Sequence, residues 1–283
     1  MRLLMKWLGI ILGSILGLAV IAALITWIGG GIVAGRTYDI PPSTFATNDK
    51  TADKSEGRRI ALTLGCVDGC HGEGLGGSVF FDNLWIGTFV APDLTRTFAD
   101  LSDAELDSVI RHGVRRNGKS TFIMPSSGLH HLSDEDLNNI AAFIRSQPLG
   151  DGPGYAAKPG LIARFFLLIR EFQPQAQNIL DGAPWMSGSP SRTSPDAGQY
   201  LALTACAECH GLDLRGENDF APSLVAVAAY SLRDFRVLMR SGVAIGNREL
   251  ELMKEVATGR FVHFTDSEVE ALYDYLRSLA GPQ

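Results

Sequence analysis

ALTACAECH, at residues 202–210, contains the pattern from which the rest of the chain can be understood. Cys206 and Cys209 are separated by two residues, and His210 follows the second cysteine at once. Two thiols at this spacing can reach the two vinyl groups on one edge of a porphyrin, and the next residue can place an imidazole under its iron. A structural zinc site would need four ligands, and no second pair lies at a suitable spacing. The pattern therefore predicts a covalently attached haem.

A second pair of cysteines encloses one residue more. Cys66 and Cys70 are separated by three residues, and His71 follows. We expect Gly69 to absorb the extra residue by adopting a positive φ angle. A domain that has lost its haem, or that holds it through a single thioether, is the alternative. The intact repeat around this motif favours a second covalent haem.

The two cysteine motifs lie in an internal repeat, which indicates two domains of one fold. Four segments of the first repeat align with four of the second, namely 61–63 with 202–204, 91–94 with 221–224, 102–124 with 231–253, and 132–146 with 264–278. Stretches rich in glycine, proline and serine mark the break between the repeats. The predicted divisions are a transmembrane anchor at 1–36, a tether at 37–55, a first domain at 56–149, a linker at 150–195 and a second domain at 196–283.

The N-terminal segment has the length and composition of a membrane span. Residues 7–35 contain no charged side chain, Arg2 and Lys6 precede them, and Arg36 follows. A bilayer core needs roughly 20 apolar residues, whereas a cleaved signal peptide has an apolar region of about 7–15. We therefore expect an uncleaved single-pass anchor. The basic residues before it favour a cytoplasmic N-terminus, with both domains outside the cytoplasm.

Small residues form a stripe along this segment at Gly9, Gly13 and Gly17. Such stripes let two transmembrane helices approach closely, so this one could contact a partner helix. Glycine is also common in membrane helices without any such role.

Helix signals dominate both repeats. Ser102 with Glu105, and Thr265 with Glu268, have the spacing of capping boxes that open amphipathic helices. Strand signals are sparse, so the predicted class is all-α, with two small helical domains in tandem after the N-terminal helix. The helices are few and short for domains of this size, and a purely apolar core would be thin. A bound haem would complete each core.

The linker contains an apolar stretch, residues 161–172, which is interrupted by Arg164, Arg170 and Glu171. The stretch is too short to span a membrane. It could lie at the membrane surface, against a partner, or on its own domain.

A six-coordinate haem iron needs a second axial ligand opposite the histidine. Met124, followed by Pro125, is the candidate in the first domain, and the ungapped alignment places Met253 at the same position in the second. Met239 aligns with Ile110 inside a helix and is predicted to be a core residue.

Four other histidines are predicted to lie at the surface. His131 and His263 align with each other just before the last helix of each repeat, and His112 and His130 have no counterpart in the second repeat. Among these, His263 is the rival of Met253 as the second axial ligand.

With these motifs in place, residues 57–148 and 197–280 resemble the class I cytochromes c, in their bacterial, membrane-anchored, two-haem form. The resemblance rests on the attachment motif, the Ala-Pro-x-Leu that follows it, the Arg-x-Gly helix end, the Met-Pro pair and a final helix ending in Tyr-Leu-Arg-Ser-Leu. Two features depart from that pattern. The first attachment motif is one residue too long, and Lys254 stands where a proline usually follows the ligand methionine.

The resemblance also implies supporting roles. The carbonyl groups of Pro92 and Pro222 would accept a hydrogen bond from the ring N–H of the axial histidine. A glycine of the first helix would pack against an aromatic residue of the last, and the pairs that fit are Gly57 with Phe143 and Gly198 with Tyr275.

Histidine–methionine ligation fills both faces of the iron, leaves no open position for a substrate and raises the haem potential. The predicted function is therefore one-electron transfer, without catalysis, from a membrane or periplasmic donor to an oxidase, a reaction centre or a soluble cytochrome, at the outer face of the bacterial cytoplasmic membrane. The alternatives are a permanent cytochrome subunit of a membrane dehydrogenase or oxidase complex and, third, a two-haem peroxidase-type enzyme. A net charge of −6 argues against nucleic acid as a partner.

Overall fold

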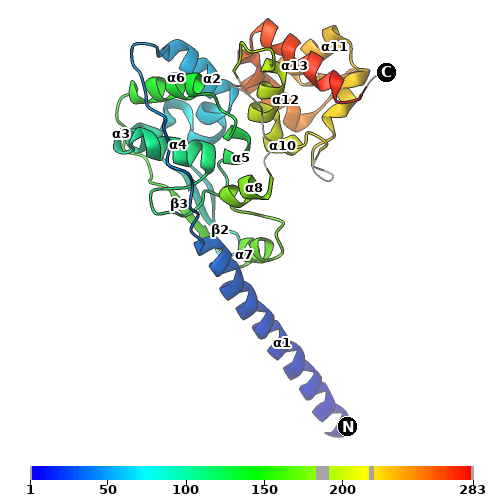
Figure 1. The fold of residues 1–283 in the computed structure, drawn as a ribbon. Helices are drawn as coiled ribbons and strands as arrows, with labels where there is room; N and C mark the ends of the chain where they lie inside the picture. Colours follow the sequence, from blue (N-terminus) through cyan, green and yellow to red (C-terminus); the bar gives the residue numbers. More distant parts are fainter. Residues whose placement is uncertain (1, 183–190, 217–219, 282–283) are drawn as a thin grey trace.

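Helix α1 (Arg2–Gly35) stands away from the body of the molecule as a single long helix (Figure 1). The computed structural model describes residues 2–182, 191–216 and 220–281. At about 1.5 Å per residue, the 34 residues of α1 extend about 51 Å, which exceeds the roughly 30 Å hydrocarbon core of a bilayer. Most of its large apolar side chains are exposed. The predicted N-terminal apolar helix is confirmed, and it is long enough to cross a membrane.

The first domain is a cluster of helices around the first cysteine motif. Its first and last helices cross closely, since a Cβ on Gly57 would lie 2.0 Å from the carbonyl oxygen of Asn139. This contact lies one turn before Phe143, the aromatic residue expected to meet the glycine. The helices are α2 (Lys54–Thr63), α3 (Leu94–Asp100), α4 (Asp103–His112), α5 (Ser126–Leu129) and α6 (Asp134–Arg145), with the short turns η1 (Cys66–His71) and η2 (Glu73–Leu75).

The second domain repeats this plan. A Cβ on Gly198 would lie 2.6 Å from the Cβ of Tyr275, which is the close approach that the resemblance implies. Gly113 ends α4 and Gly242 ends the matching helix α11, both in the left-handed conformation. The two tandem domains are therefore confirmed. The elements of the second are α9 (Ala197–Leu201), η3 (Ala202–Cys206), α10 (Ala207–His210), η4 (Leu224–Ala229), α11 (Leu232–Ser241), α12 (Glu251–Gly259), η5 (Phe261–His263) and α13 (Asp266–Ser278).

Both predicted capping boxes are present. Ser102 and Glu105 bond reciprocally at the start of α4, and Thr265 and Glu268 do so at the start of α13. In each box the hydroxyl oxygen accepts from the glutamate N–H, and the carboxylate accepts from the N–H of the cap residue. These bonds satisfy N–H groups that have no partner within the helix. The start of each helix therefore follows from local sequence alone.

A small sheet lines one side of the first domain. β1 (Ser78–Asn83), β2 (Gly87–Ala91) and β3 (Ala156–Pro159) are antiparallel in that order. Phe89 on the central strand is buried against the rings of Phe122 and Phe172. The all-α class is therefore not confirmed, because the first domain contains this three-stranded sheet. The β1–β2 hairpin occupies the long loop between the first motif and Pro92. The third strand of the sheet, β3, comes from the predicted linker, and the local sequence there does not reveal that it pairs with β2. A two-residue ribbon, β4 (Val243–Ala244) with β5 (Arg248–Glu249), lies in the second domain.

The segment predicted to be a tether, 37–55, packs along the first domain. Phe45 is 8% exposed within the main core, and Tyr38 is buried to the same extent. Thr47 donates from its N–H and its hydroxyl to Asp103 at 2.7 and 2.9 Å. Single aromatic residues in a polar stretch anchor it, and the last residues of the segment already belong to α2.

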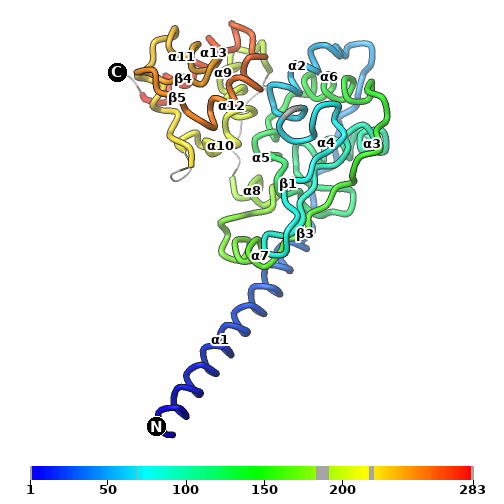
Figure 2. The backbone as a smooth tube through the Cα atoms, turned by 180° about the vertical axis from the view of Figure 1, so that it is seen from behind, coloured from blue at the N-terminus to red at the C-terminus, as the bar shows by residue number. Residues whose placement is uncertain are grey.

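Much of the predicted linker also belongs to the first domain. The N–H of Gly152 bonds to the carboxylate of Asp93 at 3.0 Å, and β3 extends the sheet. Helix α7 (Leu161–Leu168) packs beside α1 below the hairpin, as Figure 2 shows, and α8 (Gln175–Gly182) packs on α5. Residues 183–190 of the linker lie outside the described residues.

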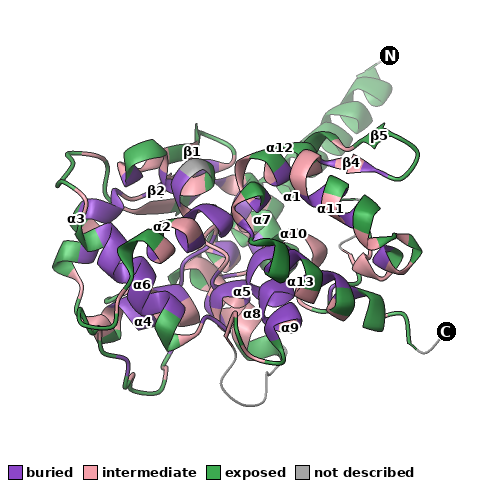
Figure 3. Ribbon diagram, turned by 90° about the horizontal axis from the view of Figure 1, so that it is seen from above, coloured by how far each residue is buried: buried purple, intermediate pink, exposed green. Residues whose placement is uncertain are grey.

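One apolar core runs through both domains. Figure 3 shows buried segments continuing from α6 through α5 to α9. Tyr200 and Leu203 of the second domain cluster with Leu137 of the first, and all three are at most 2% exposed. Gly128 lies so close to Leu203 that a Cβ there would be 3.1 Å from its carbonyl oxygen. The two domains therefore form one packed unit.

Buried charges cross the same interface. Arg192 lies 2.7 Å from Asp136 of the first domain and 2.9 Å from Glu268 of the second, and these side chains are only 5–7% exposed. Tyr200 donates its hydroxyl to Asp136 at 2.6 Å, and Arg59 contacts Glu268 at 2.7 Å. Burial alone would raise the pKa of Glu268, but the hydrogen bond from Arg59 and the charge of Arg192 outweigh it and lower the pKa to about 2. Glu268 therefore stays charged at ordinary pH.

Replacing Arg192 tests this cluster. Arg192→Met should lower the free energy of unfolding by about 3–5 kcal/mol, because two buried carboxylates lose their shared cation. Arg236→Met is the matched control, since Arg236 and Glu270 are paired but 43% and 48% exposed, and such pairs contribute about 0–1 kcal/mol. Urea titration of the full-length protein, followed by circular dichroism, measures both. Equal losses in the two variants would contradict the interdomain role of Arg192.

Candidate functional site

The first cysteine motif folds as one wide turn. Cys66–His71 form a π-type turn, in which the N–H of Cys70 bonds to the carbonyl of Gly65, five residues back, at 3.1 Å. A π-type turn holds one residue more than an α-type turn. Gly65 takes a positive φ of 75°, and Gly69 does not. The prediction for Gly69 is therefore wrong, because a wider hydrogen-bonding register absorbs the extra residue.

The second cysteine motif follows a similar turn. η3 is also π-type, with the N–H of Ala207 bonded to the carbonyl of Ala202. The short helix α10 then carries the rest of the motif to His210. Each motif thus keeps two thiols and an imidazole within a short helical stretch of backbone.

A proline carbonyl holds each motif histidine. Nδ1 of His71 lies 2.8 Å from the carbonyl oxygen of Pro92, and Nδ1 of His210 lies 2.7 Å from that of Pro222. Donation from Nδ1 selects the tautomer whose Nε2 carries no proton, which is the arrangement of a metal-ligating imidazole. Burial lowers the pKa of both rings, against the opposing effect of these hydrogen bonds. Both imidazoles are therefore neutral at ordinary pH.

The buried thiols are poorly suited to redox exchange. Burial raises the pKa of Cys66 and Cys206 to about 12, and that of Cys70 to about 11. The thiolate is the reactive form of cysteine, so these side chains remain protonated and weakly nucleophilic. A thioredoxin-like pair depends on a lowered thiol pKa, and Cys66, Cys70 and Cys206 do not meet that requirement.

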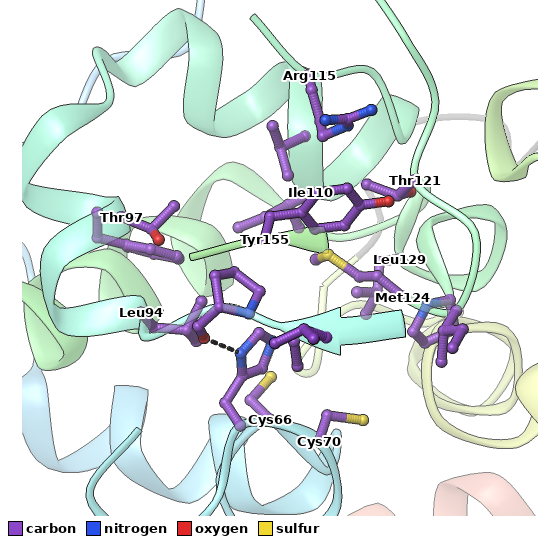
Figure 4. Close-up of a pocket in the computed structure, with 18 of the residues that line it drawn as sticks. Cys66, Cys70, Leu94, Thr97, Ile110, Arg115, Thr121, Met124, Leu129 and Tyr155 are labelled. Atoms are coloured by element: carbon purple, nitrogen blue, oxygen red, sulfur yellow. Dashed lines mark hydrogen bonds between the residues drawn. The ribbon is translucent and has the colours of Figure 1, made fainter. Parts of the chain in front are cut away.

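An apolar cavity opens beside the first motif. Cys66 and Cys70 lie at one end of it, and Met124 lies across from them (Figure 4). His71 also lines the cavity. The rest of the wall is largely aliphatic or aromatic and includes Leu64, Phe80, Phe89, Leu94, Phe98, Leu106, Ile110 and Leu129. Two thiols, an oriented imidazole and a thioether on the wall of an apolar cavity are the groups that a covalently attached haem requires.

Two polar residues that line the cavity, Arg115 and Tyr155, belong to none of the motifs found in the sequence. The guanidinium of Arg115 lies over the ring of Tyr155, 4.3 Å from its centroid, and Figure 4 shows both at the end of the cavity away from the cysteines. Arg115 Nε and Tyr155 Oη are buried, and neither has a hydrogen-bond partner within the described part of the chain. Buried polar atoms normally have partners. The pair therefore fits a cofactor that carries carboxylates, as haem does.

The two candidate methionines occupy different local structures. Met124 precedes Pro125 and lies outside the helix that follows, because the residue before a proline disfavours the helical conformation. Lys254 imposes no such restriction, so α12 begins earlier and Met253 lies in its first turn, half-buried against the shared core. The presence of Lys254 in place of the usual proline thus changes the backbone conformation around Met253.

Burial shows where the other methionine and two of the other histidines lie. Met239 is 2% exposed, which confirms it as a core residue. His131 is 6% exposed, so its prediction as a surface residue is wrong. Its ring packs against that of His130, and burial lowers its pKa to about 4. His263 is half-buried, and its carbonyl accepts from Arg59 at 2.8 Å.

Arg260 connects the two cysteine motifs. Its guanidinium donates to the carbonyl of Leu64, just before the first motif, at 2.9 Å, and to Glu208, inside the second, at 3.0 Å. The side chain is only 14% exposed. Its charge acts on both motifs, since it opposes the effect of burial on the pKa of Cys66 and of Cys206. The motifs therefore meet across the domain interface, with one largely buried cation bonded to each side.

Comparison with known proteins matches both domains. Residues 52–144 match the family described as cytochrome c oxidase, cbb3-type, subunit III, and residues 195–280 match the family described as cytochrome c. The cytochrome c subunits of alcohol dehydrogenase (quinone) from Gluconacetobacter polyoxogenes and Komagataeibacter europaeus are each 25% identical over 264 residues. The similarity covers 78% of this chain and 54% of each relative, so the chain spans about half the length of these curated relatives.

Proposed function

Because the chain belongs to the cytochrome c family and is an electron carrier, we propose that it serves as the two-haem cytochrome subunit of a membrane-bound dehydrogenase complex. The observation that carries the proposal is the meeting of two haem-attachment motifs at one interface, in a unit joined to a membrane-length helix. Both relatives are named as cytochrome c subunits of a dehydrogenase, and the similarity extends over both domains. This favours a permanent subunit over the freely acting carrier that the sequence alone predicts first.

In this proposal each domain binds one covalent haem c, whose iron supplies a one-electron redox couple. Pro92 and Pro222 orient the ligand imidazoles, and Arg115 with Tyr155 binds carboxylates of the first haem. The attachment and ligand residues are Cys66, Cys70, His71 and Met124 in the first domain and Cys206, Cys209, His210 and Met253 in the second.

The residues around the first site suit electron transfer better than catalysis. The cavity wall is largely apolar, and a histidine and a methionine that both bound the haem iron would leave no position where a substrate could bind. A peroxidase-type enzyme would need an open position, so this reading has the least support.

With one haem in each domain, electrons would pass between the domains where the motifs meet. Arg260 bonds to the backbone ahead of Cys66 and to the side chain of Glu208, so it holds both attachment sites in one arrangement. The largely buried positive charge of Arg260 would favour the reduced state of a haem in each domain. The shared core and the Arg192 cluster keep this arrangement from depending on a flexible linker.

An oxidase complex is the second candidate for the assembly that contains this chain. The observation in its favour is that residues 52–144 match the family described as cytochrome c oxidase, cbb3-type, subunit III. The chemistry of the chain is the same in both cases. In either assembly, we place the protein in the bacterial cytoplasmic membrane, with the haem domains on the periplasmic side.

Extraction with a mild detergent tests the assembly. The full-length chain should copurify in fixed stoichiometry with a larger dehydrogenase subunit, identified by mass spectrometry. Gly13→Leu should weaken this association if the stripe of Gly9, Gly13 and Gly17 contacts a partner helix, since nothing in the described chain lies within 4 Å of a Cβ there. Recovery with oxidase subunits would favour the second candidate, and recovery of the chain alone would contradict a permanent subunit.

Replacing Met253 tests the ligand whose surroundings differ most from the family pattern. Met253→Ala should remove the methionine-to-iron near-infrared band of one haem and lower the potential of that haem, because methionine ligation raises it. Met239→Leu, a nearly volume-conserving change in the core, should leave the spectrum unchanged and cost under about 1.5 kcal/mol. The assignment is wrong if Met253→Ala leaves the band intact while His263→Ala alters the second haem.

Opposite charge changes at the contact between the motifs test the interdomain path. Arg260→Gln removes a cation near both haems and should lower both potentials by tens of millivolts, where about 59 mV is a tenfold change for a one-electron couple. Glu208→Gln removes the neighbouring anion and should raise them. Potentiometric titration followed by absorbance measures the shifts. Shifts of one sign in both variants, or at one haem alone, would argue against a position of Arg260 between the two sites.

A further inference from the structure

Helix α7 exposes apolar side chains on the face that its own domain leaves uncovered. Ala163 and Leu167 are buried against the sheet, at 6% and 1% exposure. A surface helix normally carries polar residues on its other face. The outward side chains here are apolar and 42–46% exposed, and they are Ile162, Phe165, Phe166 and Ile169. Water is a poor solvent for this face.

The tip of the β1–β2 hairpin extends the same surface. Leu84 is 84% exposed and Trp85 is 59% exposed. The N–H of Ile162 bonds to the carbonyl of Trp85 at 2.9 Å, so the tip and the start of α7 are in contact. We name the outward side chains of α7 together with Leu84 and Trp85 the α7 patch. A contiguous apolar patch of this kind marks an interaction surface.

Helix α7, which carries most of the α7 patch, lies beside the upper end of α1 (Figures 1 and 2). Three glycines, Gly29–Gly31, let α7 approach α1, and a Cβ on Gly30 would lie 2.4 Å from the carbonyl oxygen of Arg164. Arg164 donates to the carbonyl of Trp27 at 2.6 Å, and its guanidinium lies 4.0 Å from the centroid of the Trp27 ring. The position of α7 along the membrane helix is therefore set by direct contact.

Distance along α1 gives the depth of the patch. Gly30 lies six residues before Arg36, the first charged residue after the apolar segment. At about 1.5 Å per residue this separation is about 9 Å. Interfacial helices bury their apolar faces about 5–10 Å into the boundary between headgroups and acyl chains. Arginine and tryptophan side chains such as those of Arg164 and Trp27 are typical of this zone.

We propose that the α7 patch inserts into the interfacial layer of the bilayer leaflet in which the C-terminal end of α1 lies. The inference rests on the assignment of α1 as the membrane anchor in the proposed function. The occupant is lipid because the patch continues the surface of α1 at the depth of the interface. Since the sheet beneath α7 also lines the first haem cavity through Phe89, insertion fixes the height and tilt of that cavity above the membrane.

Photo-crosslinking of the full-length protein in phosphatidylcholine vesicles tests the proposal. We would place p-benzoylphenylalanine at Trp85 or Phe165 in the patch, at Leu16 in α1, and at Val237 on the second domain. Val237 is the matched control, because it is 45% exposed and Phe165 is 46% exposed. The proposal predicts lipid adducts, read as mass shifts of the labelled peptides, at Leu16, Trp85 and Phe165, several-fold above the yield at Val237.

The possible outcomes distinguish a failure of the proposal for the α7 patch from a failure of the assignment of α1 as the membrane anchor. Lipid adducts at Leu16 but at neither patch position would overturn the proposal and leave the anchor intact. The absence of an adduct at Leu16 would instead overturn the anchor, and the proposal with it. Equal yields at Val237 would also overturn it. In native membranes, protein adducts in place of lipid at Trp85 and Phe165 would show that a partner subunit covers the patch, contrary to the proposal.

Discussion

The structure depends on one constraint, the attachment of a planar cofactor to two thiols and an imidazole that lie close together on the chain. Short turns bring these groups together, and the hydrogen bonds to Pro92 and Pro222 set the histidine tautomer. The remaining helices and strands must cover the parts of the cofactor that the motif does not contact. In the first domain the helices alone do not do so, and a hairpin and a strand from beyond α6 complete the cavity wall. The position of the cysteine–histidine motif thus determines where the rest of the domain must form a cavity wall.

The same constraint explains why the two domains are joined so tightly. An electron relay would need a fixed separation between its haems. Here a shared core, the buried Arg192 and the largely buried Arg260 hold the two motifs in one arrangement. Arg192 neutralises carboxylates from both domains, and Arg260 bonds to both motif regions. Buried ion clusters contribute little net stability compared with apolar packing, but they are strongly destabilising when one partner is removed. We infer that their value here is a defined arrangement of the two domains.

Features that depend on neighbouring residues could be predicted from the sequence, and features that depend on the tertiary fold could not. The capping box at Ser102 and the helix end at Gly113 are local, and both are present. Tyr155 reaches the cavity only because a strand far along the chain joins the sheet, and Phe45 anchors a stretch whose composition is otherwise that of a tether. Gly69 is a different case, because a positive φ at this glycine and a wider π-type turn can each accommodate the extra residue, and the local sequence does not distinguish them.

Intact mass spectrometry of the full-length protein, after alkylation of accessible thiols, tests the central claim most directly. Two covalent haems per chain, one in each domain, require two haem adducts and no alkylation at Cys66, Cys70, Cys206 or Cys209. A reduced-minus-oxidised absorbance spectrum of the same sample should account for both haems. A single haem adduct, with Cys66 and Cys70 alkylated, would contradict the account, because the first domain would then be a cavity without its cofactor.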